Sequence, residues 1–249
     1  MELFIVVLGL VFGSFIAAYS YRYPRGIKIS KGFSFCDKCK RKIEWYENIP
    51  VISYLFLGGK CKKCKTKISP RYPIIEFVSG LAFVLLFKYN ANVIDLNYLL
   101  LAACYLLLVL IFIIDFEHQI IPDDFVFFGI LVIILKLILF DSSSFYSPMF
   151  AGLVASGFLL LIYLLTLGRG MGLGDVKFAV FGGMLVGLNN IFIWMLLAFL
   201  TGAITGIILI LIGNAKLKDK IAFGPFLIIS IPITLIFGQN ISKFIGLTF

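Results

Sequence analysis

Apolar stretches of membrane-spanning length recur along the whole chain, and they constrain its fold more than any other feature. The 249 residues are 61% hydrophobic and 14% charged, with a mean hydropathy of +1.06. That leaves too few polar groups to cover a soluble globule of this size. Because about 20 helical residues cross the hydrocarbon core of a bilayer, we expect an all-α polytopic membrane protein with about eight transmembrane helices. They are expected near residues 3–20, 74–87, 97–114, 124–140, 148–167, 178–193, 194–213 and 222–238.

Basic residues cluster directly after the first apolar stretch. Of the 22 lysines and arginines, 14 lie from Arg22 to Arg71. Basic residues beside membrane spans mark the cytoplasmic side, so the net charge of +9 is interpreted as a topology signal and not as nucleic-acid binding. The N-terminus is then outside, and alternate crossings place 115–123, 168–177 and 214–221 in the cytoplasm.

The polar segment 21–73 holds two CxxC pairs. Cys36 and Cys39 are separated by 21 residues from Cys61 and Cys64, slightly more than is usual for paired zinc knuckles. Four thiolates fill a tetrahedral zinc site and leave no open position, so a structural zinc is predicted. The alternative is a pair of disulfides or a redox site, which a reducing cytosol disfavours.

Two aspartates lie where apolar stretches meet short polar breaks. Asp115 closes one stretch, and Asp175 ends the glycine-rich run that begins at Gly168. Two carboxylates held close cannot both ionise easily, so one can polarise a carbonyl while the other activates water. This is the chemistry of an aspartyl protease. Gly172 and Gly174 lack side chains and are expected to let an extended substrate peptide lie against the backbone.

The charged residues near Asp115 and Asp175 are interpreted as structural and not as catalytic. Asp123 and Asp124 follow Pro122 and are expected to cap the next helix. His118, Glu117 and Lys177 flank the aspartates but are left out of the catalytic set, because interfacial charges are common at span ends.

Small-residue pairs one helical turn apart also occur. Gly183 with Gly187, and Gly202 with Gly206, predict close helix packing in lipid.

Other functions remain open from these residues alone. An ion-coupled transporter also buries acids in a helical bundle, although its site lies near the bilayer midplane and not at span ends. A zinc-containing membrane scaffold or redox module without catalysis is the second alternative. For the protease, three regions are expected: a first transmembrane helix at 1–20, a cytoplasmic zinc domain at 21–73 and a transmembrane aspartyl protease domain at 74–249.

The motifs together resemble those of the type IV prepilin leader peptidases, membrane aspartyl proteases with a GxGD sequence. Besides the CxxC pairs, the matching segments are 9–15, 45–50, 71–73 with Glu76, 115–123, 172–177 and 223–226. Asp37 and Lys62 stand where many members of the family have proline, but metal binding by a CxxC pair does not need that proline.

The resemblance implies an enzyme of the bacterial inner membrane. Its substrates are type IV prepilin or pseudopilin precursors, cut on the cytoplasmic side after a glycine, with Asp115 and Asp175 as the catalytic pair. Many members also methylate the new N-terminal amine with S-adenosylmethionine. The sequence shows no methyl-donor pocket of its own, so this second cofactor and activity stay open.

Overall fold

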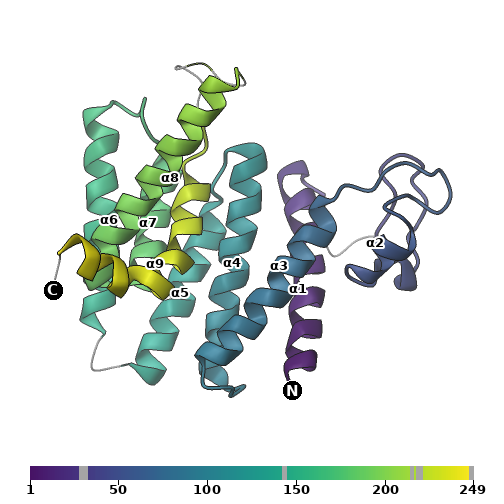
Figure 1. Ribbon diagram of the computed structural model, residues 1–249, viewed down its shortest axis with the longest axis horizontal. Helices are drawn as coiled ribbons and strands as arrows, with labels where there is room; N and C mark the ends of the chain where they lie inside the picture. Colours follow the sequence, from purple (N-terminus) through teal and green to yellow (C-terminus); the bar gives the residue numbers. More distant parts are fainter. Residues whose placement is uncertain (28–32, 142–144, 214–215, 217–220, 247–249) are drawn as a thin grey trace. The chain divides into compact units, whose positions relative to one another are not determined.

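Long α-helices dominate the computed structural model of the protein (Figure 1). The structure describes residues 1–27, 33–141, 145–213, 216 and 221–246. The predicted cytoplasmic loop 214–221 therefore falls largely outside the described residues. Within the described ranges there is no β-strand beyond two isolated bridges in the insert, and the predicted all-helical class is confirmed.

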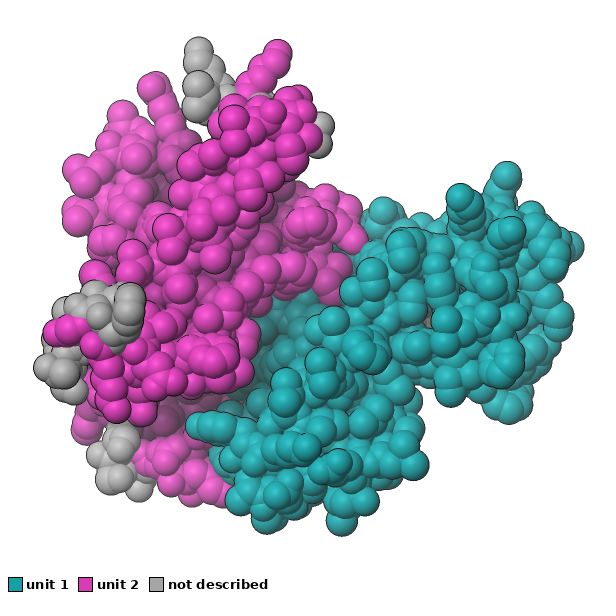
Figure 2. All heavy atoms as spheres, in the orientation of Figure 1, with its two compact units in different colours: residues 1–110 teal, residues 111–249 magenta. Residues whose placement is uncertain are grey.

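Residues 1–110 form the first of two compact units (Figure 2). Helix α1 packs along α3, and α4 begins in this unit. Between α1 and α3 lies the polar insert, with the 3-10 turn η2 and the short helix α2. The bounds are α1 Glu2–Arg22, η1 Tyr23–Arg25, η2 Trp45–Asn48, α2 Ile52–Phe56, α3 Arg71–Tyr89 and α4 Leu96–His118. Aromatic side chains, among them Phe83, Phe87 and Tyr98, form its apolar core.

Residues 111–249 form the second unit, built around helix α7. Its elements after α4 are α5 Asp123–Phe140, α6 Tyr146–Leu165, α7 Leu173–Val186, η4 Leu188–Asn190, α8 Ile191–Leu211 and α9 Gly224–Ile245. Helix α7 contacts α5, α6 and α9 (Figure 1), and its side chains Phe178 and Phe181 are fully buried. The glycine-rich run thus leads into the inner helix of this unit.

Six helices of the described chain are long and apolar enough to cross a membrane. They are Glu2–Arg25, Arg71–Tyr89, Leu96–His118, Tyr146–Leu165, Leu188–Leu211 and Gly224–Lys243. Two of the eight expected spans are not among them. Helix α5 carries three charged residues, and α7 has only 14 residues, about 21 Å of helix against about 30 Å of hydrocarbon. The protein is a multi-pass membrane protein.

The chain between α7 and α8 turns earlier than its composition suggested. The expected helices 178–193 and 194–213 are divided instead at Gly187, which ends α7 with φ of 79°. Glycine adopts this conformation without steric cost and commonly terminates helices. Gly187 therefore stops a helix and does not pack inside one, so its predicted pairing with Gly183 is wrong.

The small-residue prediction holds at only one of its four positions. A Cβ on Gly183 would lie 2.9 Å from the Ala151 carbonyl oxygen of α6, so this glycine does allow close helix packing. Gly202 and Gly206 meet only side chains, at ordinary van der Waals distances. They do not bring two helix backbones together, and the prediction for this pair is wrong.

Candidate active site and metal centre

Asp115 lies one turn before the end of α4, in the second unit. Its side chain is buried, with the residue 4% exposed, and its Oδ2 atom has no hydrogen-bond partner among the described residues. Its backbone carbonyl accepts the Gln119 N–H at 2.8 Å, after which the chain leaves the helix with φ of 55° at Gln119. A buried carboxylate oxygen without a partner is costly in a purely structural role, which marks Asp115 as a candidate functional residue.

Asp175 is the third residue of α7 and is 7% exposed. Its Oδ2 accepts the backbone N–H of Gly172 at 3.1 Å. The carboxylate therefore satisfies a free N–H at the start of its own helix, where the helix dipole favours negative charge. This local arrangement follows directly from the sequence Gly172-Leu173-Gly174-Asp175.

The two carboxylates meet at Gly224, the first residue of α9. Asp115 and Asp175 interact electrostatically, and the Gly224 N–H faces both of them, although it makes no well-formed hydrogen bond to Asp115 Oδ2. A methyl group on Gly224 would overlap the Asp115 carboxylate. Glycine is thus required where α9 approaches the ends of α4 and α7.

The side chain of Ile121 packs against the backbone of Gly174 and Gly224. A Cβ on Gly174 would lie 3.1 Å from Ile121 Cβ, and a Cβ on Gly224 would lie 3.0 Å from Ile121 Cδ1. The side chain therefore lies against the backbone beside both aspartates. Sequence reasoning placed neither Ile121 nor Gly224 in the site. For Gly224 a signal existed, since a Gly-Pro pair opens an apolar span, whereas an isoleucine in an apolar loop gives none.

The flanking charged residues pair with one another. Lys177 Nζ lies 2.7 Å from Asp123 Oδ2, joining α7 to the start of α5. Pro122 is the N-cap of α5 and no side chain makes a capping hydrogen bond, so the expectation that Asp123 and Asp124 cap this helix through their side chains is wrong. They occupy its first turn.

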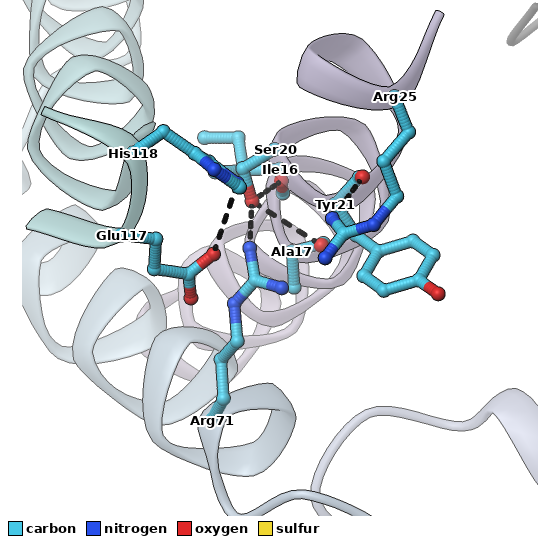
Figure 3. Close-up of polar contacts among 8 residues, drawn as sticks. All are labelled: Ile16, Ala17, Ser20, Tyr21, Arg25, Arg71, Glu117 and His118. Carbon is cyan, nitrogen blue, oxygen red and sulfur yellow. Dashed lines mark hydrogen bonds and ion pairs between the residues drawn. The ribbon is translucent and has the colours of Figure 1, made fainter. Parts of the chain in front are cut away.

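His118 and Glu117 form the second contact among the flanking residues. His118 Nε2 is 3.9 Å from Glu117 Oε2 (Figure 3).

The four insert cysteines form a cluster in the first unit. Their Sγ atoms all lie within 4.8 Å of one another, and Cys36 Sγ is 3.7 Å from Cys64 Sγ. A tetrahedral site with zinc–sulfur bonds of about 2.3 Å separates its sulfurs by about 3.8 Å. The cysteines therefore fit a four-coordinate metal ion, as their spacing predicted.

The two CxxC segments have the same backbone conformation. Lys40 N–H donates to the Cys36 carbonyl at 2.8 Å, and Lys65 N–H donates to the Cys61 carbonyl at 3.0 Å. Lys40 and Lys65 have φ of 54° and 57°, and each turn is closed by one bridge, Phe35 to Lys42 or Lys60 to Lys67. Two equivalent tight turns presenting paired thiols are the expected geometry of a metal knuckle.

Polar groups beside Cys64 favour its thiolate form. The side-chain hydroxyl and the backbone N–H of Thr66 lower the pKa of the Cys64 thiol to about 6, and a thiolate is the form that binds metal. Arg41 Nη2 donates to Glu47 Oε2 at 2.6 Å. Burial alone would raise the pKa of Glu47, but the hydrogen bond from the Glu44 backbone and the Arg41 guanidinium outweigh it and hold this pKa below its usual range.

Both halves of the chain match known protein families. Residues 7–90 match the Bacterial Peptidase A24 N-terminal domain, and residues 101–207 match the Type IV leader peptidase family. A "Prepilin leader peptidase/N-methyltransferase" of Pseudomonas aeruginosa is 31% identical, over 96% of this chain and 91% of that protein. The chain belongs to the type IV leader peptidase family.

Two further relatives are also similar to this chain over most of its length. Proteins of the same name from Legionella pneumophila and Neisseria gonorrhoeae are 36% and 31% identical, over 84% and 90% of this chain and 73% and 86% of theirs. No solved structure matches the chain. The family predicted from the motifs is confirmed.

Proposed function

We propose that this protein is a membrane aspartyl endopeptidase that removes the leader of type IV prepilin-like precursors. The observation that carries the proposal is the meeting of two buried carboxylates, Asp115 from α4 and Asp175 from α7, beside the backbone of Gly224. Membership of the leader peptidase family and the names of its relatives support the substrate class.

The proposed chemistry needs the two carboxylates to share one proton. The protonated member donates a hydrogen bond to the scissile carbonyl, and the ionised member takes a proton from the attacking water. The pair titrates as a unit, so the two roles belong to the pair. We further propose that the backbone at Gly172 and Gly174 holds the extended peptide, which then takes the place of Ile121 beside Gly174.

The proposed orientation puts the aspartates and the insert on the cytoplasmic face of the bacterial inner membrane. Its support is the run of basic residues after the first span. A precursor with a cytoplasmic leader and a membrane-embedded next segment presents its cleavage site at that interface, where an enzyme with its acids at helix ends can reach it.

The test is incubation of the purified protein in lipid with a candidate prepilin, with and without S-adenosylmethionine, followed by mass measurement of the product. Loss of the leader alone is the result expected without the methyl donor. A product carrying one extra methyl group with the donor present would assign the second activity that the relatives' names contain. An unchanged precursor under both conditions would contradict the peptidase.

For the metal centre, we propose a structural zinc held by Cys36, Cys39, Cys61 and Cys64. The support is the mutual distance of the four Sγ atoms and the paired tight turns. Zinc supplies a cross-link between two segments of an insert that has little apolar core, and metal binding in small domains contributes folding free energy of about 10 kcal/mol.

Cys36→Ser is expected to lose the metal and unfold the insert. Removal of one thiolate leaves three ligands at a site built for four, so the bound zinc per chain should fall severalfold and the insert should become sensitive to protease. Metal analysis of the purified protein and limited proteolysis measure these effects. Cys104→Ala, at the cysteine in α4, is the matched control and should keep the metal. Full zinc content in Cys36→Ser would contradict the four-thiolate site.

A further inference from the structure

Helix α2 of the insert presents an exposed apolar stripe. Ile52, Leu55 and Phe56 are 49%, 70% and 88% exposed, and their spacing of three and four residues puts them on one face of the helix. Trp45, in the neighbouring turn η2, is 79% exposed. Exposed large apolar side chains on adjoining elements mark an interaction surface when they are this concentrated, and these four lie outside the cysteine cluster.

Hydrogen bonds connect the start of α2 to the membrane helices α1 and α3, at residues that lie inside the ends of those helices. Val51, the residue before α2, has φ of 59° and ψ of −49°, a costly conformation for a β-branched residue. Its N–H donates to Glu76 Oε2 of α3 at 2.7 Å, and Glu76 also shares a hydrogen bond with Ser14 of α1. A buried carboxylate thus holds the insert against both helices.

The depth of this anchor follows from helix geometry. Glu76 is five residues inside α3, and Ser14 is eight residues before the end of α1, which correspond to about 8 Å and about 12 Å along the helix axes. Arg71 and Arg25 lie near those ends. Arg71 donates to Ser20 Oγ at 2.6 Å and Arg25 to the Tyr21 carbonyl at 2.7 Å (Figure 3).

Arginines at span ends lie at the headgroup level. The anchor of α2 therefore lies about 10 Å deeper, at the depth that amphipathic interfacial helices reach.

The positive charge of the insert and its exposed aromatic side chains favour lipid as the partner of this surface. The insert, residues 21–73, contains 14 basic and 3 acidic residues. Lys62 Nζ lies 5.3 Å from the centre of the Tyr46 ring, and that ring packs edge-on against Trp45 at 5.8 Å. Tryptophan and tyrosine beside lysine are typical of the membrane–water interface, where each basic residue near an anionic surface contributes about 1 kcal/mol.

We propose that α2 and Trp45 lie in the headgroup region of the bilayer that α1 and α3 cross. The stripe Ile52, Leu55 and Phe56 is buried among the upper acyl chains, and the surrounding lysines contact anionic headgroups. The insert is thereby held flat on the membrane surface, with its cysteine cluster beside the lipid. This inference stands independently of the proposed peptidase activity.

The chain offers a direct probe, because Trp45 and Trp194 are its two tryptophans and Trp194 is fully buried. The full-length protein is placed in nanodiscs of equal parts phosphatidylcholine and phosphatidylglycerol, with bromine on the acyl chains of the phosphatidylcholine. The difference in fluorescence between the unaltered protein and Trp45→Phe isolates Trp45. We expect bromolipid to quench Trp45 strongly and aqueous iodide to quench it weakly.

The matched variant is Leu55→Ser with Phe56→Ser, whose bound metal is measured as a control for folding. We expect it to reverse the pattern, with severalfold stronger iodide quenching of Trp45 and loss of bromolipid quenching. Trp45 that iodide reaches equally in both proteins, without bromolipid quenching, would overturn the proposal. Protection of Trp45 only after a prepilin peptide is added would also overturn it, because the surface would then bind substrate and not lipid.

Discussion

Asp175→Asn is expected to leave a folded, metal-containing protein that cleaves a prepilin at least about a thousandfold more slowly. The physical reason is that asparagine keeps the shape of the side chain, and its Oδ1 can still accept the Gly172 N–H that Asp175 accepts at 3.1 Å. Only the titrating acid is removed. Without it the pair cannot hold one proton and one negative charge, so water activation at the scissile carbonyl is lost.

Asp115→Asn should give the same loss, because the two acids act as a unit and the double variant should be little worse than either single one. The measurement is the cleavage rate of a purified prepilin at saturating enzyme, with thermal unfolding and zinc content recorded for each variant. Asp141→Asn is the matched control. It makes the same chemical change at a half-buried carboxylate that pairs with Lys136 at 2.8 Å, and it should cleave normally. Normal processing by Asp115→Asn or by Asp175→Asn would reject the mechanism.

The second large effect is expected from Gly224→Ala. The added methyl group would overlap the Asp115 carboxylate, so either the carboxylate or the start of α9 must move. Displacement of a reacting group by about 1 Å can lower the rate about a hundredfold. We therefore expect a loss of about that size in the cleavage rate, while the unfolding temperature changes little, because alanine is a good helix former.

Gly157→Ala is the control for this substitution, since a methyl group there would meet no atom within 4 Å. It should retain full cleavage. The outcome that would count against the site is full activity of Gly224→Ala, which would mean that α9 does not lie against the Asp115 carboxylate in the working enzyme.

Local sequence patterns predicted much of this structure. Long apolar runs predicted membrane helices, because backbone groups in lipid must be satisfied within a helix. The CxxC spacing predicted a four-cysteine cluster, because both knuckles form from residues within a few positions of each other. The Gly172 to Asp175 run likewise contained its own hydrogen bond.

The division of the stretch 178–213 was predicted at the wrong residue. This stretch is apolar apart from Asn189, Asn190, Thr201 and Thr205, and its polar pair Asn189–Asn190 lies beside Gly187 and not near residue 194. The break depends on the backbone conformation of Gly187 and on the packing of α7 inside its unit, with Phe178 and Phe181 buried among its neighbours.

The amino-acid sequence by itself therefore determined that the chain is a helical membrane protein with a metal-binding insert and two acids at helix ends. Only the tertiary structure decided that those acids converge on Gly224 under Ile121, and that Val51 is tied to Glu76. The physical reason is range. Periodicity and ligand spacing are encoded within one or two turns of chain, whereas these contacts join residues up to 109 positions apart and exist only once helices have packed.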